Sequence, residues 1–210
     1  MEVLGHPQIP SKTAEKILEA ATRVFTTKGF AGTRMEEIAA ASGINRALLN
    51  YYYRSKETLF EVVFSRHFIQ MQSGMGTILS GNMTVEEKIR GIVQHYHKTI
   101  TQNPSLPLFV IQELSVNPDR VLKMMRIAMG SPENHAAVFI RQVDQEGRDG
   151  KIRKIDGAHL LVSVFAMVMY PFIGRPILKM VLRKDEGQYE SFIDERPDFI
   201  INTILQSLKP

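Results

Sequence analysis

Two short helical segments joined by a glycine turn, within residues 33–57, constrain the fold more than any other part of the chain. Thr33 and Glu36 have the spacing of a capping box, so we expect a helix to begin at Thr33. Gly43 can adopt the left-handed backbone conformation that ends a helix and opens a turn. This stretch therefore predicts a helix-turn-helix.

Capping residues follow the turn as well. Asn45 can cap a helix that runs to about Tyr52, and Ser55 can cap a longer helix, which we expect over residues 56–79. In front of the motif, residues 12–28 carry an apolar stripe at helical spacing and predict a further helix. The N-terminal part is therefore expected to contain three helices, with a long helix leading out of it.

The helix after the turn has one apolar and one polar side. In a helix-turn-helix the second helix enters the major groove, where side chains contact base edges and phosphates. Arg46 can pair with guanine and Asn50 with adenine. The apolar residues expected to face inward are Ile38, Ala39, Ile44, Leu49 and Tyr53. The residues predicted to contact DNA are Thr33, Arg46, Ala47, Asn50, Tyr51, Tyr52 and Lys56.

The remainder of the chain is also rich in helix signals. Thr84 and Glu87 form another capping box, and proline follows a capping residue at Asn117-Pro118 and Ser131-Pro132. No alternating strand pattern is present in the sequence. These features predict an all-α fold.

The domain organisation follows from this pattern. We expect a flexible N-terminal tail in residues 1–11 and a helix-turn-helix DNA-binding domain in residues 12–55. Residues 56–210 are expected to form a helical ligand-binding and dimerisation domain, with the helix over residues 56–79 as the connector.

Composition excludes several classes of protein. The chain has no cysteine, so disulfides and thiolate chemistry are absent, and a net charge of +4 permits nucleic-acid binding without requiring it. The N-terminus lacks the pattern of a signal peptide. The longest apolar stretch, Leu160 to Ile173, has about 14 residues and is too short to span a bilayer. We therefore expect a cytoplasmic protein with no membrane partner.

Residues 12–60 contain a set of segments that one family shares. They are the apolar stripe Ile17–Phe25, Gly29-Phe30, Thr33, Glu37-Ile38-Ala39, Ser42-Gly43-Ile44, Leu49, Tyr51-Tyr52-Tyr53 and Ser55-Lys56-Glu57-Thr58-Leu59-Phe60. With these segments, residues 12–60 resemble the TetR family of bacterial transcriptional repressors. The resemblance implies a homodimer that binds a pseudo-palindromic double-stranded DNA operator and is released when a small molecule binds the C-terminal body. The sequence departs from the family pattern at Leu48, where Thr or a small residue is frequent, and at Asn50, where Tyr is frequent.

The C-terminal region contains many methionine and phenylalanine residues, which can serve an effector site. Methionine adapts to irregular ligands, and ligand pockets are mostly apolar with a few polar groups. We expect a small apolar effector, although any one of these methionine or phenylalanine residues is more often part of an ordinary core. The candidate ligand contacts are Phe68, His95, Phe109, Gln112, Glu113, Met125, Phe165 and Met169.

The segment Ala158–Tyr170 is apolar on most sides, which indicates a helix buried on more than one face. One face can meet the body and another a second copy of the chain. The candidate dimer contacts, drawn from this helix and the last one, are Leu160, Ser163, Met167, Phe199, Ile200 and Ile204. No cofactor or metal is expected, because His95 and His97 diverge on a helix.

Two other functional classes compete with a DNA-binding regulator. An enzyme is not expected, since the sequence has no nucleophile elbow, phosphate loop or metal-ligand spacing. The alternative is a ligand-binding or scaffold protein with a degenerate helix-turn-helix, which the departure at Asn50 leaves open. Activation rather than repression also stays open.

Overall fold

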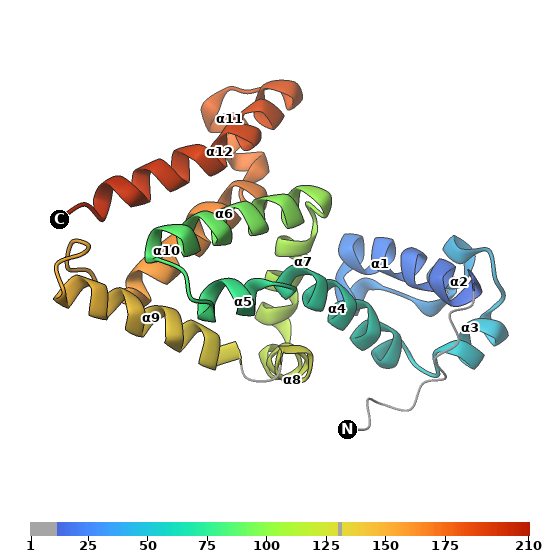
Figure 1. The fold of residues 1–210 in the computed structure, drawn as a ribbon. Helices are drawn as coiled ribbons and strands as arrows, with labels where there is room; N and C mark the ends of the chain where they lie inside the picture. Colours follow the sequence, from blue (N-terminus) through green and yellow to red (C-terminus); the bar gives the residue numbers. More distant parts are fainter. Residues whose placement is uncertain (1–11, 130–131) are drawn as a thin grey trace.

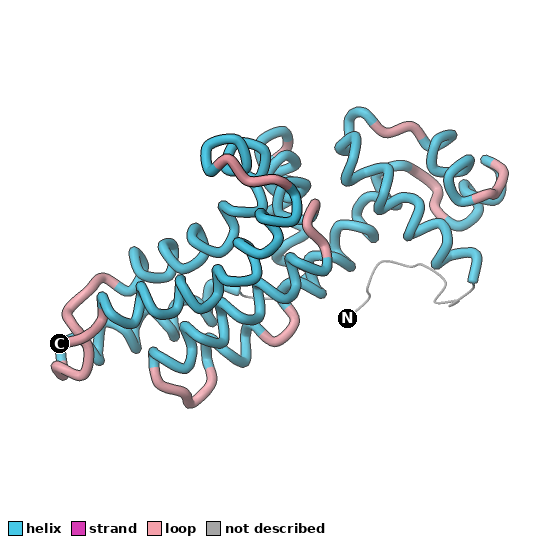
Figure 2. The backbone as a smooth tube through the Cα atoms, turned by 90° about the horizontal axis from the view of Figure 1, so that it is seen from above, coloured by secondary structure: helices cyan, strands magenta, loops and turns pink. Residues whose placement is uncertain are grey.

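The computed structural model describes residues 12–129 and 132–210, and every regular element in these ranges is an α-helix (Figure 1). The protein is all-α, as the sequence predicts. Its first helices form a small lobe at one end, and the others form a larger body (Figures 1 and 2). The predicted tail, residues 1–11, lies outside the described residues.

The N-terminal lobe has three helices, α1 (Lys12–Gly32), α2 (Met35–Ser42) and α3 (Arg46–Tyr52). α1 is kinked at Gly29, whose φ of 68° lies in the left-handed region that favours glycine. Gly43 has a φ of 70° and ends α2. The predicted helix, glycine turn and helix are therefore confirmed.

The start of α2 differs from the prediction. Arg34 caps the helix, and its N–H donates to the Glu37 carboxylate at 3.3 Å. Thr33 points inward, is 2% exposed, and donates its hydroxyl to the Gly29 carbonyl at 2.7 Å. The predicted capping box of Thr33 with Glu36 was wrong, because the kink at Gly29 leaves a carbonyl that the Thr33 hydroxyl satisfies.

The connector is shorter than predicted. α4 (Lys56–Gln72) begins at the expected cap, where the Ser55 side chain accepts a hydrogen bond from the Thr58 N–H at 3.1 Å. It does not extend to residue 79, because the chain breaks at Gly74, which has a φ of 86° and precedes α5 (Met75–Ser80). The connector between lobe and body is therefore α4 alone (Figure 1).

The body is built from α5 and the helices that follow it. The Thr84 and Glu87 capping box is present at the start of α6, as predicted. Packing pairs α6 with α10 and α12, and α5 with α9, while α7 and α8 contact α1 and α4 respectively. These helices are α6 (Val85–Gln102), α7 (Leu106–Val116), α8 (Pro118–Met129), α9 (Pro132–Arg148), α10 (Gly157–Ile173), α11 (Arg175–Leu182) and α12 (Glu186–Ser207).

Near the C-terminus, Pro171 predicts a kink or a restart of its helix before Leu182. α10 continues through Pro171 to Ile173, and α11 begins at Arg175 after a break at Gly174, with 80° between the two helices. The sequence predicts a final helix from Asp198 to Leu208, or one that starts nearer Glu190. It begins earlier, at Glu186, because Asp185 caps it and accepts a hydrogen bond from the Gln188 N–H at 2.8 Å.

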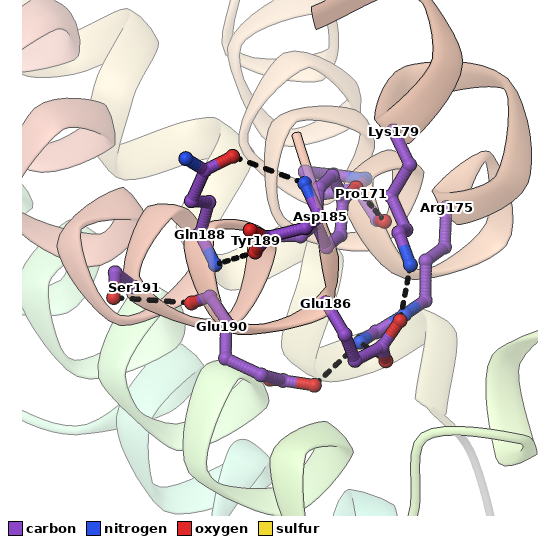
Figure 3. Close-up of polar contacts among 10 residues, drawn as sticks. Pro171, Arg175, Lys179, Asp185, Glu186, Gln188, Tyr189, Glu190 and Ser191 are labelled. Atoms are coloured by element: carbon purple, nitrogen blue, oxygen red, sulfur yellow. Dashed lines mark hydrogen bonds and ion pairs between the residues drawn. The ribbon is translucent and has the colours of Figure 1, made fainter. Parts of the chain in front are cut away.

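Polar contacts hold the corner between α10 and α12. The Tyr189 hydroxyl donates to the Pro171 carbonyl at 2.6 Å, and Arg175 and Lys179 of α11 both pair with Glu186 (Figure 3). By length and composition, no single helix within the described ranges could cross a membrane. The bent pair of α10 and α11, with 80° between them, meets that test jointly.

Candidate functional site

The α2–α3 unit separates a buried flank from an exposed one. Ile38, Ala39, Leu49 and Tyr53 are at most 7% exposed, and Ile44 packs partly buried against the same core. These are the five residues that the sequence predicts to face inward. The unit is thus held to α1 by apolar packing, which leaves the opposite side of α3 free to face a partner.

The exposed side of α3 carries polar and small residues. Arg46, Ala47, Leu48 and Asn50 are exposed, and Tyr51 is 78% exposed with its ring centre 5.7 Å from that of Tyr52. The start of α3 is capped directly after the turn, because the Asn45 side chain accepts a hydrogen bond from the Leu48 N–H at 2.8 Å. Side chains suited to base edges therefore lie along one accessible helical surface.

Arg46 makes an ion pair across the turn. Its guanidinium lies 3.5 Å from the Glu36 carboxylate, and both side chains are largely exposed, at 42% and 69%. An exposed pair of this kind contributes little to stability. The guanidinium can therefore exchange Glu36 for another acceptor at small cost.

Two side chains that were predicted to contact phosphate instead form hydrogen bonds within the protein. Thr33 is buried, as described above. The Lys56 ammonium donates to the carbonyls of Phe30 and Thr33 at 3.0 and 3.1 Å and lies 4.4 Å from the centre of the Phe30 ring. Backbone carbonyls at the end of α1 and just after it thus attract both side chains in this geometry. The DNA contacts of Thr33 and Lys56 stay a prediction.

Other basic residues are better placed to contact DNA. Arg34 and Arg54 are exposed at the start of α2 and just after α3. The prediction did not include them, although their positions beside the motif were a visible signal. Tyr52, which was predicted to contact DNA, is half-buried against the core.

The body contains a cavity of about 380 Å³, between the end of α4 and the helices α5, α6, α9 and α10. Its lining is mostly apolar. The Tyr96 hydroxyl donates to the Gln72 side chain at 3.1 Å, and burial raises the pKa of Tyr96 to about 12. The lining residues are Ile69, Gln72, Ser73, Met75, Gly76, Leu79, Tyr96, His135, Ala136 and Phe165.

Of the predicted ligand contacts, Phe165 lines this cavity. Phe68 and Phe109 lie in the core at 1% exposure, because their rings pack against Phe64. The His95 ring is bonded to the Met71 carbonyl at 2.9 Å.

The other four predicted contacts also lie away from the lining. Gln112 is exposed on α7, and the Glu113 carboxylate bonds to Phe30 and Arg120. Met125 and Met169 pack, partly buried, against the core. Apolar periodicity cannot distinguish a core side chain from one that faces a cavity. A ligand contact at these residues stays a prediction.

The predicted dimer contacts divide in the same way. Leu160, Ile200 and Ile204 are at most 4% exposed within a single chain, where they pack in its core. Their role in a dimer stays a prediction. Met167 is partly buried, whereas Ser163 and Phe199 are exposed. The inner faces of α10 and α12 are used by the body itself.

Within the residues that the structure describes, no three His, Asp or Glu side chains are grouped in a way that could hold a metal ion. The molecule combines a helix-turn-helix, whose second helix exposes a polar side, with a body that contains an apolar cavity, and α4 joins the two. Such an arrangement can bind DNA at one end and a small molecule at the other.

Comparison with known proteins identifies the family. The profile for bacterial regulatory proteins of the tetR family matches residues 17–63. YttP of Bacillus subtilis (strain 168), whose name is "Probable HTH-type transcriptional regulator", is 23% identical over 178 residues, which cover 81% of this chain and 82% of YttP. The helix-turn-helix lobe of the chain therefore belongs to the TetR family.

Further relatives agree with this membership. RutR of Escherichia coli (strain K12), an HTH-type transcriptional regulator, is 43% identical to this chain over 53 residues, a quarter (25%) of each chain. The solved structure of the TetR-family regulator PfmR from Thermus thermophilus has the same fold, with a TM-score of 0.64, 19% identity, and coverage of 89% of this chain and 97% of PfmR. With its TetR-family lobe and its HTH-type relatives, the protein is a transcriptional regulator, and these relatives are regulators rather than enzymes.

Proposed function

We propose that this TetR-family regulator is a homodimeric repressor that binds a pseudo-palindromic operator with one α3 helix in each of two major grooves. The observation that carries the proposal is the outward surface of α3, where Arg46, Asn50 and Tyr51 are exposed while Leu49 between them is buried. A two-fold pair of such helices matches the repeat of the duplex.

The side chains on this surface suit different parts of the duplex. Arg46 can leave Glu36 for a guanine edge, since phosphates would favour the arginine and repel the carboxylate. Asn50 can pair with adenine, and Ala47 allows close approach. Tyr51 at the exposed rim, together with Arg34 and Arg54, suits phosphate contacts.

Replacing Arg46 by Ala is expected to relax sequence preference at one base pair and to cost about 1–3 kcal/mol on the preferred base there. The measurement is binding to duplexes selected with the wild-type protein from a random pool, at fixed salt. Arg54→Ala is the matched control. It should weaken binding to all sequences alike and lower the slope of log affinity against log salt concentration by about one.

The same titration tests DNA binding itself. A wild-type affinity that does not fall with salt would contradict the proposed interface. An equal loss on every sequence for Arg46→Ala would assign that residue to phosphate instead of a base.

The cavity supports a small-molecule effector. Its volume of about 380 Å³ lies in the range of small-molecule sites. The lining indicates an uncharged, largely apolar ligand with a polar group that can bond to Gln72 or to the protonated Tyr96 hydroxyl. Ile69 and Gln72 lie on α4, the helix that also joins the DNA-binding lobe. A ligand that favours a different position of α4 would lower operator affinity by linkage.

Filling the cavity is expected to block binding there. Ala136→Phe should weaken binding of the apolar dye N-phenyl-1-naphthylamine by roughly ten-fold or more, because a ring would occupy the space that the ligand needs. Thr77→Phe, which adds a ring at an exposed position of α5, is the control. Equal dye affinity in both variants and the wild type would place the dye elsewhere.

The outer faces of α10 and α12 support the dimer. Val162 is 66% and Phe199 57% exposed, and Ser163 and Ala166 add small exposed residues on α10. The Ser163 hydroxyl already donates to the His159 carbonyl at 2.8 Å, so burying it would leave no unpaired donor. Exposed apolar side chains on two helices that pack together suit contact with a second copy.

A further inference from the structure

A buried carboxylate of the body holds the kinked end of α1. At Gly29 the helix loses its regular conformation, and the next N–H, that of Phe30, donates to Oε1 of Glu113 at 2.7 Å. Glu113 lies on α7 and is 3% exposed. A backbone donor that the kink would otherwise leave unpaired is therefore satisfied from the other domain.

The other oxygen of the same carboxylate is held by α8. Nη2 of Arg120 lies 2.9 Å from Oε2 of Glu113, and the two side chains are 17% and 4% exposed. The Arg120 guanidinium stacks 3.9 Å from the Phe30 ring centre and 4.8 Å from that of Phe60. Within the described residues Nε of Arg120 has no hydrogen-bond partner, so its placement depends on Glu113 and these two rings.

Lys56 of α4 also contacts Phe30. Its ammonium bonds the Phe30 and Thr33 carbonyls and lies over the face of the Phe30 ring. The N–H, the carbonyl and the ring of Phe30 are thus held by side chains from α7, α4 and α8. Arg34, the cap of α2, follows four residues after Phe30, so the course of the chain into the helix-turn-helix begins at this point.

We propose that Glu113 and Arg120 are positioning residues for DNA binding: they fix the orientation of the DNA-binding lobe on the body without touching DNA. A shift of α7 or α8 against α1 removes the acceptor from Phe30 and leaves a buried carboxylate or guanidinium unpaired, which low-dielectric surroundings penalise strongly. The lobe therefore has one favoured orientation while the pair is intact. This inference rests on the proposed DNA-binding surface.

The test uses Glu113→Ala and the isosteric Glu113→Gln in the full-length protein. Glu113→Ala is expected to weaken binding to the wild-type-selected duplex by roughly 3- to 30-fold. Glu113→Gln, which keeps an acceptor for Phe30 but loses the ion pair, should show a smaller loss. Gln112→Ala, at the exposed neighbouring position on α7, is the matched control and should bind as the wild type does.

Orientation is measured directly, because a merely structural role would leave it unchanged. The chain has no cysteine, so spin labels can be attached at Ala41→Cys on α2 and Lys98→Cys on α6, both exposed, in protein diluted with unlabelled chain. Glu113→Ala should broaden or shift the distance distribution between the labels, while circular dichroism shows the helices intact. Glu113→Gln provides the same comparison if the alanine variant does not fold.

An unchanged distance distribution, or an affinity loss equal to the unfolded fraction, would overturn the positioning role. If the wild type selects no duplex at all, the proposed DNA function fails. The label distances then still decide whether the Glu113–Arg120 pair sets the orientation of the lobe.

Discussion

Replacing Phe60 by Ala is expected to lower the free energy of unfolding by about 3–5 kcal/mol. Phe60 is fully buried at the start of α4, and its ring centre lies 5.1 Å from that of Phe25, 5.0 Å from that of Phe30 and 5.6 Å from that of Phe109. Removing the ring loses contacts with α1 and α7 together and leaves a cavity where lobe and body meet. Urea unfolding at fixed protein concentration measures the change.

Two further variants calibrate this prediction. Phe60→Leu keeps most of the side-chain volume and should lower the free energy of unfolding less than Phe60→Ala does. Leu108→Ala removes an apolar side chain from α7 that is 42% exposed, and it should change stability by about 0.5 kcal/mol or less. Equal losses for Phe60→Ala and Leu108→Ala would contradict the view that the aromatic cluster joins the two domains.

Placing a charge at Val162 is expected to separate the proposed dimer. Val162→Glu would bury a carboxylate in the interface, and association would then require its desolvation. Without an associated second copy, each half-site is bound independently, so operator affinity should fall by roughly 10²- to 10⁴-fold. Sedimentation velocity and operator titration of the same sample measure both effects.

Val116→Glu is the matched control, because Val116 is 73% exposed on α7, outside the proposed interface. It should leave both the assembly state and the operator affinity unchanged. A Val162→Glu protein that still sediments as a dimer would exclude the outer face of α10 as the contact. A monomeric variant with wild-type operator affinity would contradict the two-site mode of binding.

Local signals predicted most of the helices, because short-range chemistry decides where a helix begins. The caps at Asn45, Ser55 and Thr84 are present as expected, and Gly43 adopts the left-handed conformation that the turn requires. Helix ends were less predictable. The helix expected over residues 56–79 ends at Gln72, because the chain breaks at Gly74.

The apolar stripe of the DNA-binding lobe was also predictable, since few arrangements bury Ile38 and Leu49 together. The cavity lining and the exposed faces of α10 and α12 were not predictable in this way. Phe68, Phe109 and Phe165 are indistinguishable in the sequence, yet two lie in the core and one lines the cavity. Only the packing of distant helices determines which apolar side chain meets another side chain and which meets empty space.

The sequence by itself determined the all-α fold, the helix-turn-helix and the exposed side of α3, because residues three or four apart on a helix fix these features. The tertiary structure decided the roles of Thr33, Lys56 and Glu113. The kink at Gly29 frees backbone groups that side chains up to 83 residues away must satisfy. Such pairings depend on where separate helices meet in space, and the spacing of residues along the sequence does not reveal this.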